Sequence, residues 1–73
     1  MTETELKNLT KKTLGWAGEL SEEWVGTTKG NVIEYQRKHV QELFDAGDLN
    51  LVSVAVLELA QTCENVESES DGY

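Results

Sequence analysis

The sequence predicts an all-α protein of two or three helices that pack as a helical hairpin or a small bundle. Apolar residues recur every three or four positions along most of the chain, which is the period of one face of an α-helix. Glycine-containing breaks separate three such segments. With 73 residues, the chain has room for one domain with one modest core. We place a single helical domain at residues 1–63 and an acidic tail at residues 64–73.

The first predicted helix has the clearest amphipathic pattern. The stripe that faces the core consists of Leu6, Leu9, Thr13, Trp16, Ala17, Leu20 and Trp24. Thr2 and Glu5 have the spacing of a capping box at its start. Gly15 and Gly18 fall on the opposite side, where each costs about 1 kcal/mol relative to alanine. We predict one continuous helix; the alternative is a break near Gly18, with Ser21 capping a second helix.

The second predicted helix follows a loop at residues 26–30, where two glycines enclose polar residues. Asn31 is the expected N-cap, and Glu34 has the position that completes a capping box. One face of this helix carries Val32, Ile33, Gln36, Val40, Leu43 and Phe44. Gly47 fits the left-handed position that ends a helix.

The third predicted helix runs from Leu51 to about Val66, with Asp48 or Asn50 as its cap. One side of it carries Val52, Ala55, Val56, Leu59 and Cys63. The competing interpretation of residues 49–59 is a strand, because β-branched residues alternate there. Such a strand has no period-2 partner within the chain and could pair only with another copy.

Val54 and Leu57 lie outside the core stripe of the third helix, and we predict that they form a homodimer interface. A chain this short has little net stability without an additional constraint. Cys63 is the only cysteine, so an intrachain disulfide cannot supply one. The residues after Glu64 are acidic and have no apolar period, so we expect a disordered tail that is dispensable for folding.

Catalytic chemistry has few candidate groups in this sequence. The chain contains one histidine and one cysteine, and neither has the partners of a nucleophilic or zinc site. We interpret His39 as a histidine at the edge of the core and Cys63 as a small buried hydrophobe. The sequence therefore predicts no enzyme, no cofactor and no metal site.

Aromatic residues are the candidates for contact with a partner, because tryptophan and tyrosine are enriched at binding hot spots. We select Trp16, Trp24 and Tyr35. The alternative role of both tryptophans is packing in the core, which is the commoner one in a small chain.

The net charge of -8 disfavours direct nucleic-acid binding, which needs a basic face. No apolar run reaches the about 20 residues of a membrane span, and the acidic start is unlike a signal peptide. With its lone thiol, the sequence predicts a cytoplasmic protein.

These observations together predict a small regulator or adaptor that binds another protein and forms a homo-oligomer. From size and charge alone, with no motif, we form the hypothesis of an accessory or inhibitory protein of a phage or mobile element. A second hypothesis is an acidic mimic of nucleic acid that inhibits a nucleic-acid-binding enzyme. A third is a helical structural or assembly subunit.

Overall fold

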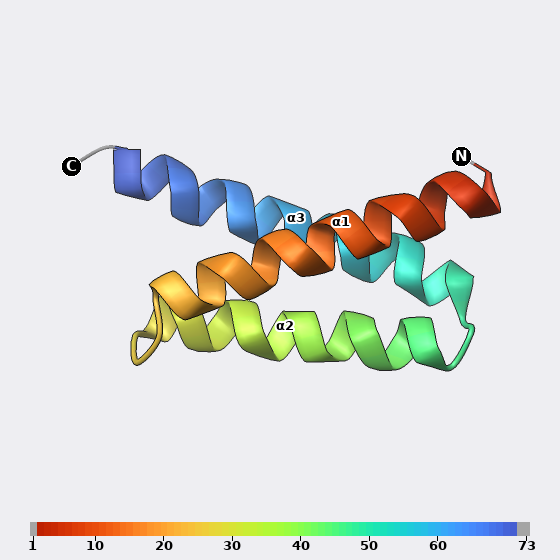
Figure 1. Cartoon of the computed structure of the whole chain (residues 1–73), viewed down its shortest axis with the longest axis horizontal. Helices are drawn as coiled ribbons and strands as arrows, with labels where there is room; N and C mark the ends of the chain where they lie inside the picture. The colour runs from red at the N-terminus through yellow and green to blue at the C-terminus, as the bar shows by residue number, and fades with distance from the viewer. Residues whose placement is uncertain (1, 72–73) are drawn as a thin grey trace.

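The chain folds as three helices that run up, down and up, and each helix packs against the other two. This computed structural model describes the backbone of residues 2–71 and the side-chain environments of residues 2–68. The helices are α1 (Glu3–Glu23), α2 (Thr28–Asp45) and α3 (Leu49–Asp71), and α3 lies behind α1 in Figure 1. The bundle measures 38 × 20 × 15 Å. The all-α prediction is confirmed, and the strand interpretation of residues 49–59 is wrong because that segment is helical.

Helix α1 is continuous across Gly15 and Gly18, as predicted. Thr2 caps it: the backbone N–H of Glu5 donates to Thr2 Oγ1 at 3.1 Å, and the Thr2 hydroxyl donates to the Glu5 carboxylate at 3.2 Å. Both glycines have open space beside them, so they approach no neighbouring side chain or backbone. Their low helix propensity does not break α1 because one buried stripe spans the whole helix.

Helix α2 begins at Thr28, three residues before the predicted start, so Asn31 is not its cap. The cap is Thr27, whose hydroxyl oxygen accepts from the Gly30 N–H at 3.1 Å. Gly30 is buried inside the first turn, and a Cβ there would collide with the Trp24 carbonyl. The glycine that suggests a loop in the sequence thus lies inside α2, where it allows the backbone to pass close to the end of α1 at Trp24.

Helix α3 begins at Leu49, two residues before the predicted start. Gly47 has φ 78°, which confirms its left-handed conformation. Of the two predicted caps, Asp48 is the one in place, because its Oδ1 accepts from the Leu51 N–H at 3.3 Å.

The far end of α3 reaches Asp71, so the domain boundary after residue 63 does not coincide with the end of an element. Val66 is buried beyond that boundary. Disorder of the acidic tail stays a prediction, and residues 72–73 of that tail lie outside the described part of the chain.

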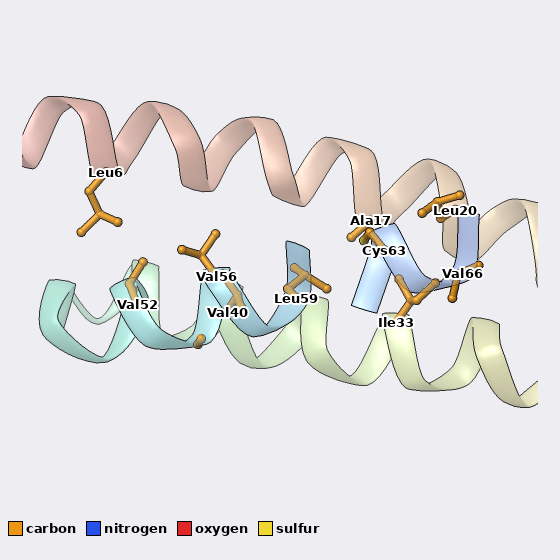
Figure 2. Packing of buried hydrophobic residues seen from close by; sticks show 11 residues of the cluster. Leu6, Ala17, Leu20, Ile33, Val40, Val52, Val56, Leu59, Cys63 and Val66 are labelled. Atoms are coloured by element: carbon orange, nitrogen blue, oxygen red, sulfur yellow. The ribbon is translucent and has the colours of Figure 1, made fainter. Parts of the chain in front are cut away.

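The core lies along the axis between the three helices, as Figure 2 shows for side chains that point inward from each of them. Its buried apolar members are Leu6, Ala17, Leu20, Ile33, Val40, Val52, Ala55, Val56, Leu59, Cys63 and Val66. The last six belong to α3, which therefore contributes more than half of the buried apolar side chains. Thr10 and Thr13 are also buried, and the Thr10 hydroxyl donates to the Leu6 carbonyl at 2.7 Å, which satisfies its hydrogen-bonding need.

Candidate functional site: the outer surface of α2 and α3

The surface of α3 outside its core stripe carries three large apolar side chains. Leu51, Val54 and Leu57 are 52%, 58% and 59% exposed. They lie three residues apart, so they form one short stripe across about two turns of the helix, which we call the outer stripe. The structure thus places both predicted dimer-interface residues, Val54 and Leu57, on one accessible surface and adds Leu51 to them.

Helix α2 also exposes an apolar and an aromatic side chain, on the side where it meets Glu58 of α3. Val32 is 43% exposed and Tyr35 is 75% exposed. The exposure of Val32 corrects its predicted place on the core face of α2, because it lies at the edge of that face beside α3. Val32 and Tyr35 line a hollow of about 390 Å³ between α2 and α3, which we call the α2–α3 hollow. Its lining is Thr28, Asn31, Val32, Tyr35, Gln36, His39 and Glu58.

A second hollow, of about 330 Å³, lies between the beginnings of α1 and α3. Its lining includes Leu6, Leu9, Leu49, Val56 and Leu57. Leu57 therefore borders both the outer stripe and this mainly apolar hollow. A partner that covers the stripe can also place a side chain beside Leu57.

The two tryptophans have contacts within the bundle. Trp16 is half-buried against the core, and its Nε1–H donates to Glu67 Oε1 at 2.6 Å, which joins α1 to the end of α3. Trp24 is also partly buried, and the Lys29 ammonium lies 4.9 Å from its ring centroid. The structure therefore does not bring Trp16 and Trp24 onto the surface that Tyr35 shares with α3, and a role for them in partner binding stays a prediction.

Among the described residues, the pKa shifts belong to Glu34, Arg37 and Cys63. Burial, with the nearby Glu67 carboxylate, raises the pKa of the Cys63 thiol to about 11, so the thiol stays protonated near neutral pH. Glu34 accepts two hydrogen bonds from the Arg37 guanidinium, which lowers the pKa of that carboxyl. Among the described residues, no three His, Cys, Asp or Glu side chains are grouped to hold a metal ion.

Helices α1 and α3 both terminate at the same end of the bundle (Figure 1), and their last turns carry several acidic residues. The exposed members with described side chains are Glu19, Glu22, Glu23, Glu64 and Glu67. We call this group the acidic end. It contrasts with the α2–α3 hollow, where Glu58 is the single acidic residue in the lining.

No known protein family matches the sequence, and no curated protein or solved structure is significantly similar to it. Among residues 2–71, no helix combines the length and the apolar character that crossing a membrane requires.

Sequence reasoning missed Leu51, Gln36 and Glu58 as surface or hollow residues. Leu51 could have been found by extending the three-residue spacing of Val54 and Leu57 backward by one step. The hollow itself has no signal in the sequence, because it depends on which sides of α2 and α3 face each other.

Proposed function

We propose that this protein is a small regulator or adaptor that acts by binding another protein and not by catalysis, and that it forms a homodimer. The observation that carries the proposal is the exposure of the outer stripe, Leu51, Val54 and Leu57, outside the core stripe of α3. Large contiguous apolar patches are uncommon on small monomers and mark interaction surfaces.

The energetic reason for a contact is the size of these side chains. Full burial of a leucine or valine is worth about 1.5–3 kcal/mol, and in a two-fold dimer each residue contributes twice. The inner stripe of α3 is already covered by α1 and α2, so covering the outer stripe requires another chain. Tyr35 and Val32 are exposed on α2.

Sedimentation equilibrium of a charge-matched pair of variants tests the dimer. Leu57→Lys places a charge within the outer stripe, and we expect it to convert a dimer into a monomer or to unfold the chain. Ser68→Lys adds the same charge to an exposed position of the same helix, about 16 Å further along its axis, and should stay dimeric. A folded monomer for the unmodified chain at tens of micromolar, or a dimeric Leu57→Lys variant, would contradict the proposed interface.

Affinity capture from the native cell, followed by mass spectrometry, tests the regulator or adaptor function. We expect the unmodified chain and the Ser68→Lys variant to capture the same protein. Tyr35→Ala should lose it if that protein binds the surface of α2 that carries Tyr35. Equal capture by all three proteins would place the contact elsewhere.

The acidic end supports a second candidate function, an acidic mimic of nucleic acid that inhibits a nucleic-acid-binding enzyme. Glu19, Glu22, Glu23, Glu64 and Glu67 are exposed at one end of the bundle. Such binding should weaken steeply between low and physiological salt, because exposed charges are screened over about 8–10 Å. Affinity for the captured protein that is independent of salt would exclude the mimic and favour the apolar surface.

A further inference from the structure

We infer that the α2–α3 hollow is a binding site for an arginine side chain presented by a partner protein. The inference rests on the proposed protein-binding function and specifies the chemistry of one contact. Tyr35, Gln36 and Glu58 are the residues that would receive the guanidinium.

The hollow has the size and position of an anchor site. Its volume of about 390 Å³ lies within the range of about 300–1,000 Å³ typical of small-ligand pockets. It opens between α2, which lines it with the exposed Val32 and Tyr35, and Glu58 of α3. A partner surface that covers Tyr35 and Val32 would bring its own side chains to the mouth of this hollow.

The charge at the hollow favours a cation. Glu58 is exposed on α3, and no described lysine or arginine forms an ion pair with its carboxylate. The chain as a whole carries a net charge of -8, which attracts basic partners over long range. An anionic ligand would meet the Glu58 carboxylate without a fixed positive charge among the lining residues.

The other lining groups select a planar cation with an aliphatic stem. The Tyr35 ring is largely exposed, and aromatic faces attract guanidinium groups both electrostatically and by stacking. Val32 offers an apolar wall against which methylene groups can pack. The chain already contains one such pairing, because the Lys29 ammonium lies over the Trp24 ring.

Gln36 supplies a reason for a ligand with several hydrogen-bond donors. Its Oε1 is buried and has no hydrogen-bond partner among the described residues. Buried acceptors are almost always paired in folded proteins, so this oxygen favours the entry of a donor group. Rotation of the Gln36 amide toward the hollow would let one N–H of a guanidinium pair with it while another pairs with Glu58. A lysine ammonium lacks the planar, forked arrangement of donors that both contacts require.

The test is a titration of the full-length chain with N-acetyl-arginine amide, followed by two-dimensional ¹H–¹⁵N NMR spectroscopy. We expect saturable shifts of the amides of Val32, Tyr35 and Glu58. N-acetyl-lysine amide should bind several-fold more weakly, and N-acetyl-norleucine amide should give no saturable shifts at these positions. The same spectra report whether each variant is folded.

Two carboxylate-to-amide variants each remove one negative charge from α3, one at the hollow and one away from it. Glu58→Gln should weaken binding of the arginine probe about tenfold, which corresponds to about 1.4 kcal/mol. Glu64→Gln, which removes the same charge from an exposed position of the same helix, should change it less than about twofold. Tyr35→Leu should also weaken binding while keeping an apolar side chain at this position.

Three results would overturn the inference: shifts that do not saturate, shifts spread equally over all acidic residues, or equal affinity in Glu58→Gln and the unmodified chain. Failure of the proposed function is distinguishable from these. A dimeric protein that captures a partner but does not bind the arginine probe refutes only the arginine site. Specific binding of the probe without dimerisation or capture refutes only the wider function.

Discussion

The two halves of α3 bury the same kind of stripe but present different outer surfaces. On the inner side, Val52, Val56 and Leu59 of the first half are followed by Cys63 and Val66 of the second, and all five are buried. On the outer side, the first half exposes the outer stripe. The second half exposes Gln61, Glu64, Asn65 and Ser68.

This difference shows which part of the α3 surface is needed for folding and which part is available for binding. The second half shows that α3 can pack in the bundle with a polar outer surface, as amphipathic surface helices usually do. The apolar outer surface of the first half is therefore not required for the fold. We attribute it to a contact with another chain, and variants along α3 can test that attribution.

The largest expected effect is a difference in the free energy of unfolding between alanine variants of Leu57 and Leu59, which lie two residues apart on α3. Leu59→Ala removes a fully buried side chain from the inner stripe and should lower the free energy of unfolding by about 2–5 kcal/mol. Leu57→Ala should change it by less than about 0.5 kcal/mol at concentrations that dissociate the dimer. At higher concentrations, the loss should grow because the interface is removed.

Urea denaturation at two protein concentrations measures both effects. The difference between unmodified chain and Leu57→Ala should depend on concentration. If that difference is the same at both concentrations, Leu57 stabilises the single chain and does not contribute to a dimer interface. The two halves of α3 would then not differ in binding.

The second prediction concerns the buried thiol of the second half. Because burial raises the pKa of Cys63 from 9.0 to about 11, the folded state holds the proton more tightly than the unfolded state. The stabilising contribution is complete below pH 9 and is lost as pH rises toward 11, by about 2–3 kcal/mol in total. Denaturation at pH 8, 9, 10 and 11 measures the loss. Cys63→Ala provides the control, because the part of the pH dependence of the unfolding free energy that disappears in this variant is due to the thiol. Identical pH dependence in both proteins would show that Cys63 is more accessible than its packing indicates.

The third prediction concerns the position in the second half of α3 beyond which the chain no longer contributes to stability. The sequence alone predicts that the chain after Glu64 is dispensable, but Val66 is buried and Glu67 accepts a hydrogen bond from Trp16. Truncation after Glu64 removes both contacts and should lower the stability by about 1.5–3 kcal/mol. That loss corresponds to a melting temperature more than about 5 °C lower. Truncation after Ser68 keeps both contacts and should leave the melting temperature nearly unchanged. Equal melting temperatures for the two truncated chains would restore the prediction of a tail that is disordered from residue 64.

The fold was largely predictable from the sequence because hydrophobic period determines the helices. The predicted stripes of α1 and α3 contain most of the residues that the structure buries, but Thr10 and Val66 are buried outside them. Gly47 ends α2 as its conformational freedom suggests. The start of α2 is misplaced in the sequence analysis because Gly26 and Gly30 suggest a loop. Thr27 has the residue type of an N-cap, but the sequence does not show that Gly30 is needed inside the helix beside the Trp24 carbonyl.

The candidate site was predictable only in part, for the same physical reason. Val54 and Leu57 stand out in the sequence because they lie off the core stripe of their own helix. Gln36 and Glu58 come together through the packing of α2 on α3, which no spacing within one helix reveals. Residue type alone suggests Trp16 as a partner contact, whereas in the structure its indole N–H donates a hydrogen bond to Glu67.

The smallest expected effect is on the free energy of unfolding, when a lysine is introduced on the outer surface of each half of α3. The last turn of α3 contains no basic residue, although a cation near the C-terminus of a helix interacts favourably with the helix dipole. Ser68→Lys should therefore raise the free energy of unfolding by about 0.3–1 kcal/mol at low ionic strength. Screening should remove most of this gain in 1 M salt, where the Debye length is about 3 Å. Thermal denaturation at both ionic strengths measures it, and Ser68→Gln serves as a neutral control of similar helix propensity.

Leu57→Lys introduces the same charge on the first half and should lower stability at both ionic strengths, because there it opposes the burial of apolar surface. A stabilising Leu57→Lys would show that the outer stripe is an ordinary solvent-facing surface, like that of the second half.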